Sequence, residues 1–235
     1  MNRAELKAEA KENLRGNWSW AAFVGVLITV INGIIFSPQI KTVIEDLQNF
    51  NSGQLLDDFT PNQILDPGYW SGRLGSNVGL GLLSGFFMLS MVVTFLNFSR
   101  GRKLPVLKAT FSVFTDNRFI PEFLNYLLSY LFQYLWTFLL LIPGIVKSYS
   151  YALTPYIVND LVESGQEVHA TTGITASRRL MAGHKWELFK LDLSFIGWTI
   201  IALIPFGLGL IWLTPYIQTT RANFYRKLAG DQFTK

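Results

Sequence analysis

The sequence predicts an all-α fold, a polytopic bundle of six transmembrane helices arranged as three hairpins with both termini in the cytoplasm. Half of the residues are hydrophobic and only 15% are charged, against about 25% in an ordinary soluble domain. A helix needs about 20 mostly apolar residues to cross a bilayer. Four stretches without a charge approach or exceed this length, at 18–36, 76–98, 123–146 and 193–220. We therefore treat 1–235 as a single integral membrane domain.

The same composition excludes several classes of protein. Too few charges are present to cover a soluble enzyme or a disordered chain, and the absence of cysteine excludes disulfides, thiolate zinc sites and iron–sulfur clusters. The net charge of +4 is spread over short connectors between apolar runs, a pattern typical of membrane topology. No nucleic-acid partner is expected.

Residues 1–17 are predicted to form a cytoplasmic amphipathic helix. Asn2 and Glu5 have the spacing of a capping box, and Gly16 is suited to end the helix. One face of this helix carries apolar residues, Leu6, Ala10 and Leu14. We favour a helix on the protein surface over a specific docking element.

The longest predicted loop, 37–75, lies on the outer side. Its first part has helical apolar spacing and is predicted to lie on the outer leaflet. The remainder is rich in Asn, Asp, Gly and Ser, which is typical of a surface loop. Its acidic residues lack the spacing of a calcium loop, so solvation explains them.

Two proline-marked breaks decide how often the chain crosses the membrane. If Pro143-Gly144 and Pro205 mark kinks, the chain crosses four times; if they mark hairpin tips, it crosses six times. Lys and Arg favour cytoplasmic loops, and seventeen of the 20 are inside in the six-helix arrangement against thirteen in the four-helix one. Six helices are therefore expected, at 18–36, 76–98, 121–142, 144–161, 186–204 and 206–223. Pro155 and Pro215 should kink the fourth and sixth of them.

The connector 162–185 is predicted to be an amphipathic cytoplasmic helix on the inner leaflet. Its apolar face carries Ala170, Ile174, Ser177 and Met181. Basic residues on it and after the second helix are expected to contact anionic inner-leaflet lipids, namely Arg100, Arg102, Lys103, Arg178 and Arg179.

Polar side chains follow a helical repeat inside two apolar runs. The first set is Tyr126, Tyr130, Gln133 and Tyr134, and the second is Lys147, Tyr151 and Thr154. Polar groups facing lipid would lack hydrogen-bond partners, so these stripes should face inward. They are explained either by polar packing between helices or by contact with a ligand or lipid head group, and packing is favoured.

Lys147 is the most informative single residue, because an ammonium inside a membrane is costly. It lies one turn from the predicted outer end of its helix. Snorkelling to the outer head groups and pointing inward toward an anionic lipid group are both compatible with that position.

Several motifs of the second half resemble a bacterial membrane family, Domain of Unknown Function 975. These motifs include Leu-Ile-Pro-Gly-Ile-Val-Lys-Ser-Tyr within 139–151, and residues 154–156, 177–183, 185–189, 193–198, 215–216 and 224–225. The resemblance covers most of 120–228, and the first two helices fit more loosely. It implies a multi-pass protein of the bacterial cell membrane and supplies no reaction. The chain is also distantly similar to the membrane portion of some glycerophosphodiester phosphodiesterases, without their catalytic barrel.

Three functional hypotheses follow. The first is a non-enzymatic membrane protein that binds lipid, a partner membrane protein or a second copy of itself. The second is a small transporter or lipid flippase that uses the inward polar stripe around Lys147. The third, a membrane enzyme, is disfavoured because the sequence contains no catalytic motif. No catalytic residue, cofactor or metal site is expected.

Overall fold

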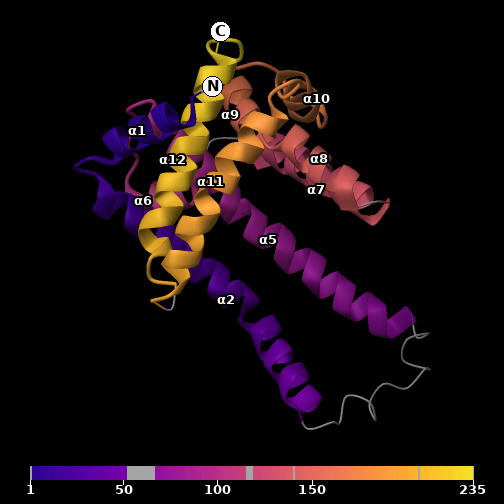
Figure 1. Ribbon diagram of the computed structural model, residues 1–235. Coiled ribbons are helices and arrows are strands. Elements are labelled where there is room, and N and C mark those ends of the chain that lie inside the picture. Colours follow the sequence, from indigo (N-terminus) through magenta and orange to yellow (C-terminus); the bar gives the residue numbers. More distant parts are fainter. Residues whose placement is uncertain (1, 52–66, 115–118, 140, 206, 235) are drawn as a thin grey trace.

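The described chain is built of helices joined by short turns (Figure 1). The computed structural model describes residues 2–51, 67–114, 119–139, 141–205 and 207–234. The all-α class predicted from the sequence is confirmed over these residues. Both termini lie at the same end of the molecule (Figure 1).

Helix α1 (Arg3–Leu14) packs against the C-terminal helix α12 (Leu210–Ala229). Asn2 caps it by accepting a hydrogen bond from the Ala4 backbone N at 3.1 Å. Gly16 follows at φ 74, a left-handed conformation that favours glycine. The predicted apolar face is buried to 1% exposure or less, at Leu6, Ala10 and Leu14. The predicted helix therefore exists, and its apolar face is covered by the protein itself.

Two long helices, α2 (Trp18–Asn51) and α5 (Pro67–Ser99), pack on each other and extend beyond the rest of the molecule (Figure 1). Their segments Trp18–Ser37 and Gly79–Ser99 are long and apolar enough to cross a membrane. The other helices of the described chain do not meet that test. Two helices of membrane length are therefore observed there, in place of the six predicted.

The predicted outer loop 37–75 is shorter than expected. Helix α2 continues to Asn51 and α5 begins at Pro67, so helix covers both ends of that loop. The apolar spacing assigned to a separate helix on the outer leaflet instead continues α2 without a break. Residues 52–66 lie outside the described residues.

Two short helices follow α5, namely α6 (Val106–Thr110) and the 3₁₀ helix η1 (Ser112–Phe114). The next two helices, α7 (Phe119–Leu139) and α8 (Leu141–Tyr151), pack as an antiparallel pair. Phe86 of α5 stacks on Phe119 and Phe123 and anchors the start of α7. Pro143 lies in the first turn of α8, where its missing N–H costs no helical hydrogen bond.

The predicted helix 144–161 is two helices, because α8 ends at Tyr151 and α9 (Thr154–Glu163) begins after a turn. Pro155 lies in the first turn of α9, as expected of a residue that cannot continue a helix. Helix α10 (Thr172–Leu180) follows, and Ile174, Ser177 and Met181 are buried. The predicted apolar face of the connector therefore packs largely on α8 and α9.

The last pair, α11 (Lys185–Leu203) and α12, forms a second hairpin. Pro215 lies inside α12, as predicted. The turn between α11 and α12 lies beside the middle of the apolar segment of α2, since Gly207 and Leu208 line the same cavity as Gly25 and Thr29. This hairpin therefore ends well before the end of that segment at Ser37.

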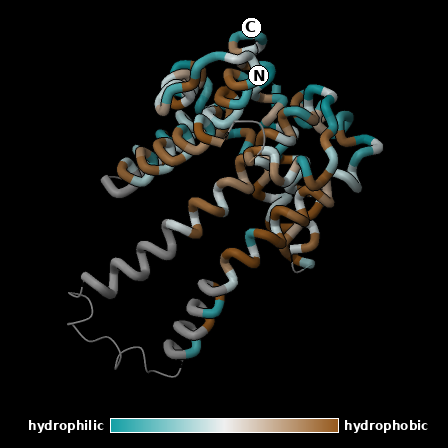
Figure 2. Tube along the Cα trace, turned by 180° about the vertical axis from the view of Figure 1, so that it is seen from behind, coloured by the Kyte–Doolittle hydropathy of each residue, from teal (hydrophilic) through white to brown (hydrophobic). Residues whose placement is uncertain are grey.

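Hydropathy divides the molecule along its length. Figure 2 shows apolar residues along α2 and α5 and hydrophilic residues gathered around the two termini. The turn region of the second hairpin is apolar and open, with Ile204 76% and Leu208 59% exposed. Ile142, near the turn of the first hairpin, is 75% exposed. Both turns are therefore suited to contact hydrocarbon.

Candidate functional site

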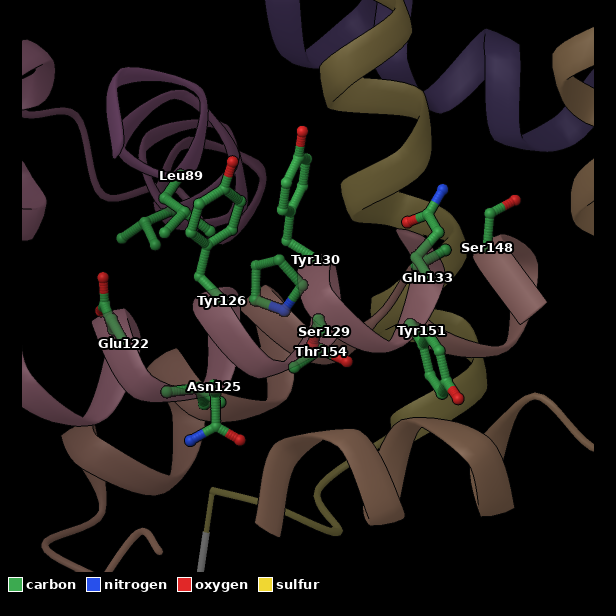
Figure 3. A pocket seen from close by; sticks show the side chains of 14 residues that line it. Leu89, Glu122, Asn125, Tyr126, Ser129, Tyr130, Gln133, Ser148, Tyr151 and Thr154 are labelled. Atoms are coloured by element: carbon green, nitrogen blue, oxygen red, sulfur yellow. The ribbon is translucent and has the colours of Figure 1, made fainter. Parts of the chain in front are cut away.

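A cavity of about 180 Å³ lies between α5, α7, α8 and α9 (Figure 3). Much of its surface is apolar, but nine of its 14 lining residues carry polar groups, and it is called the polar cavity for that reason. Its lining contains five of the seven residues that the sequence predicted for ligand or lipid contact, namely Tyr126, Tyr130, Gln133, Tyr151 and Thr154. The first three come from one face of α7, as the helical repeat requires. The other two flank the break between α8 and α9.

The two tyrosines of α7 form one side of the cavity. Tyr126 and Tyr130 lie one turn apart and project in the same direction, with ring centroids 6.3 Å apart (Figure 3). Gly85 of α5 leaves room for this, because a Cβ atom there would lie 1.7 Å from the Tyr126 hydroxyl oxygen. The close approach of α5 to α7 thus depends on glycine at this position.

Two hydroxyl groups in the lining are buried without a hydrogen-bond partner among the described residues. They are Oγ1 of Thr154, a residue that is 2% exposed, and Oγ of Ser129. A buried hydroxyl in a helix usually bonds to a backbone carbonyl or to water, and leaving it unbonded costs about 1–3 kcal/mol. Both groups can therefore serve a ligand that enters the cavity.

One end of the cavity is formed by Glu122 and Asn125 of α7 (Figure 3). Both polar atoms of the Asn125 side chain form hydrogen bonds within the protein. Its amide N donates to the carbonyl oxygens of Pro121 and His169, and its Oδ1 accepts from the Gly173 N at 3.0 Å. It ties α10 to α7. Glu122 is 4% exposed and adds a carboxyl group to the lining.

Sequence reasoning missed Glu122, Asn125, Ser129 and Ser148 as members of the lining. A signal was present, because Glu122, Ser129 and Gln133 continue the i, i+3 and i+4 spacing of the tyrosines. The predicted stripe therefore began one turn too late on α7.

The remaining two predicted contacts lie outside the cavity lining. Lys147 turns toward α7, and its Nζ lies 4.4 Å from the centroid of the Trp136 ring. Tyr134 is 56% exposed on α7. A ligand role for these two residues remains a prediction, independent of the cavity.

The basic residues predicted at the inner leaflet have different surroundings. Arg100 forms a buried ion pair with Asp160, Arg102 pairs with Glu163 at 2.8 Å, and Lys103 donates to the Asn17 side-chain oxygen at 2.8 Å. Arg178 and Arg179 are exposed on α10 and form no hydrogen bond or ion pair with the described residues. Of the five, these two are the most available to lipid phosphates.

The comparison with known families agrees with the resemblance in the sequence. A family described as a protein of unknown function (DUF975) matches residues 1–154 and 138–232, nearly the whole chain. The chain belongs to the DUF975 family. Searches of curated proteins and of solved structures gave no significant match.

The two DUF975 matches overlap at 138–154. This overlap includes α8 and the break that follows it, and so contributes Ser148, Tyr151 and Thr154 to the cavity. In the described part of this DUF975 chain, no group of three or more His, Asp or Glu residues is placed to hold a metal ion.

Proposed function

We propose that this DUF975 protein is a non-enzymatic, multi-pass protein of the bacterial cell membrane that binds a lipid. The polar cavity would hold the head group of that lipid. The observation that carries the proposal is the pair of buried hydroxyls without hydrogen-bond partners among the described residues, Thr154 Oγ1 and Ser129 Oγ. They lie in a cavity whose lining combines tyrosines, amides and a carboxyl group with apolar side chains of α5 and α9.

Membrane placement is supported by the two helices of membrane length and by the apolar, exposed turns of the two hairpins. Water would disfavour so much exposed apolar surface, whereas hydrocarbon would not. We further propose that all six membrane helices enter from a cytoplasmic side that contains both termini, with α2 and α5 as the full-length spans. The hairpins α7–α8 and α11–α12 would point toward the outer leaflet.

The lining of the cavity favours a head group with hydroxyl or amine donors. The lining includes the carboxyl of Glu122, the amide of Gln133 and the hydroxyls of the tyrosines and Thr154, and no Lys or Arg is among its described residues. A hydrogen bond formed away from water gains more than one formed at the surface, so a small number of such groups can select a head group.

Substitution of the unbonded hydroxyl tests this proposal. Thr154→Val keeps the shape of the side chain and removes only Oγ1. We expect the purified variant to retain less lipid than the unaltered protein when both are released from detergent micelles in native mass spectrometry. Thr199→Val is the matched control, because the Thr199 hydroxyl donates to the Phe195 carbonyl of its own helix at 3.0 Å, away from the cavity.

Equal lipid retention by Thr154→Val and the unaltered protein would contradict the head-group assignment. Co-purification of a partner protein in place of lipid would instead support the alternative that the membrane face of this protein binds another subunit. A second copy of the chain as that subunit would be recognised by its mass.

One observation favours a second function, a small transporter or lipid flippase. The cavity is bounded by the break between α8 and α9, and discontinuous helices often flank transport sites. Scrambling of a labelled lipid between leaflets of reconstituted vesicles would test it. Scrambling that Thr154→Val abolishes would favour transport, and vesicles without scrambling would favour binding alone.

A further inference from the structure

A second cavity lies between α1 and the hairpin α11–α12, away from the polar cavity. Its volume is about 670 Å³, and one end is basic while the rest is apolar. The basic end carries Lys7 and Lys11. The apolar wall is formed mainly by Trp18, Trp198, Ile201, Pro205, Trp212 and Leu213.

Charges on α1 are sorted between two faces. The acidic face meets the end of α12, where Lys227 lies 2.7 Å from Glu5 and Arg226 lies 3.6 Å from Glu9. The basic face, with Lys7 and Lys11 one turn apart, is directed to the cavity. Glu5 and Glu9 therefore pair with α12, while Lys7 and Lys11 line an apolar groove.

Neither lysine forms an ion pair with a carboxylate of the described chain. Lys7 Nζ donates to the Ser194 carbonyl at 3.2 Å and lies 4.0 Å from the Phe195 ring centroid. Lys11 Nζ lies 5.8 Å from the Tyr216 ring centroid. Two lysines one helical turn apart that line the same groove, neither paired with a carboxylate of the described residues, favour an anion beside them.

The pKa of Lys7 agrees with this arrangement. Burial lowers it from its ordinary value, and the positive charges of Arg3 and Lys11 lower it further. An anion at the mouth of the groove would oppose both effects by stabilising the charged form.

The length of the groove matches one leaflet. It runs from the level of Ser194, whose carbonyl oxygen accepts the hydrogen bond from Lys7, to Pro205 at the turn of the hairpin. At about 1.5 Å per helical residue this is roughly 16 Å, about half of a 30 Å hydrocarbon core. Trp18, the first residue of the membrane-length segment of α2, also lines the groove, and tryptophans are typical of the membrane interface.

We propose that this groove binds one anionic phospholipid of the inner leaflet, with its phosphate at Lys7 and Lys11. One acyl chain lies along α11 and α12 toward Pro205. The proposal rests on the membrane placement proposed above, but it uses residues that the polar cavity does not share. A phospholipid fits better than free phosphate because most of the groove is apolar and suits an acyl chain.

Competition between two lipids tests the site. The full-length protein is reconstituted with equal amounts of phosphatidylglycerol and phosphatidylcholine, and the bound lipids are counted by native mass spectrometry. We expect preferential retention of phosphatidylglycerol. The double variant Lys7→Gln/Lys11→Gln should bind it about thirtyfold more weakly, since each basic residue near an anionic surface contributes about fivefold.

The matched control is Lys108→Gln/Lys185→Gln, which removes the same charge outside the groove. It should retain phosphatidylglycerol normally. The single variant Lys11→Gln separates a loss of binding from a folding defect, because the Lys11 ammonium makes only a distant contact with the Tyr216 ring. This variant should bind phosphatidylglycerol about fivefold more weakly.

Equal loss in the control, or unchanged retention in both groove variants, would overturn the proposal. Displacement of phosphatidylglycerol by inorganic phosphate would also overturn it, because the site would then recognise an anion without its acyl chain. A different result would contradict the proposed function of the polar cavity, namely lipid retention that Thr154→Val does not change.

Discussion

Arg100 and Asp160 form a bidentate ion pair in which both N–O distances are 2.6 Å. The pair joins the end of α5 to α9, and the Asp160 side chain is 1% exposed. Tyr225 of α12 donates its hydroxyl to the same carboxylate at 2.6 Å. One buried carboxylate therefore holds three helices together at the end of the molecule that contains both termini.

Removing the charge of Asp160 should be costly. Burial of the Tyr225 hydroxyl, together with the negative charge of Asp160, raises the pKa of Tyr225, so the hydroxyl stays protonated and continues to donate. In Asp160→Asn the Arg100 guanidinium would be left without its counter-ion. We expect a loss of about 3–5 kcal/mol in the free energy of unfolding, measured by thermal unfolding in detergent.

The control for that variant is Glu163→Gln, which breaks the pair with Arg102, whose side chain is 54% exposed. Exposed pairs contribute about 0–1 kcal/mol, so this variant should unfold almost like the original protein. Similar losses in both variants would show that the Arg100–Asp160 pair is not the stronger link.

Attachment of α1 to α12 should weaken in acid. A hydrogen bond from Lys227, and then its positive charge, lower the pKa of Glu5 below its ordinary value of 4.5. A carboxyl with a lowered folded-state pKa stabilises the protein above its unfolded pKa, and this contribution is lost as the pH falls through the lower folded value. The contribution is therefore complete at neutral pH and disappears below about pH 4.5.

The measurement compares thermal midpoints of the original protein and Glu5→Gln between pH 7 and pH 3.5. The two midpoints should differ at pH 7 and converge as the pH falls. A difference that stays constant across the range would mean that the Glu5–Lys227 pair does not hold α1.

Gly85 should be hard to replace. A Cβ atom at this position would lie 1.7 Å from the Tyr126 hydroxyl oxygen and 2.1 Å from its Cζ, so the Tyr126 ring would have to move. Gly85→Ala should destabilise the protein by about 1–3 kcal/mol, despite the higher helix propensity of Ala. Gly79→Ala is the control, because nothing lies within 4 Å of a Cβ atom there. Chemical unfolding should leave Gly79→Ala unchanged or slightly stabilised, and equal losses would argue against the close approach of Tyr126.

The absence of native cysteine allows a direct test of membrane topology. Single-cysteine variants are treated with an impermeant thiol reagent in intact and in permeabilised bacterial cells. Lys41→Cys should react in intact cells, and Arg178→Cys should react only after permeabilisation. Ile204→Cys and Ile142→Cys, near the apolar turns, should react in neither case, because hydrocarbon would cover them.

Two results would contradict this arrangement. Labelling of Ile204→Cys in intact cells would mean that the α11–α12 hairpin crosses the whole bilayer. Labelling of Arg178→Cys in intact cells would place α10 outside and reverse the assignment of the basic connectors.

Much of the secondary structure could be predicted, because helices leave a local record in the chain. Asn2, Gly16 and the proline near each turn act through the backbone of their own segment. The cavity was found in part for the same reason, since Tyr126, Tyr130 and Gln133 share a face through the helical repeat alone.

Sequence alone determined that the protein is helical and which polar residues share a face, whereas the break after Tyr151 and the continuation of α2 to Asn51 were not predicted. Tertiary structure alone decided what each face meets: Arg100 meets Asp160 sixty residues away, α1 meets α12, and Lys147 meets Trp136 outside the polar cavity. It also decided that the last hairpin ends beside the middle of the α2 apolar segment. The physical reason is that a repeat of 3.6 residues defines the direction of a side chain around its own helix axis, whereas its partner depends on how separate helices pack.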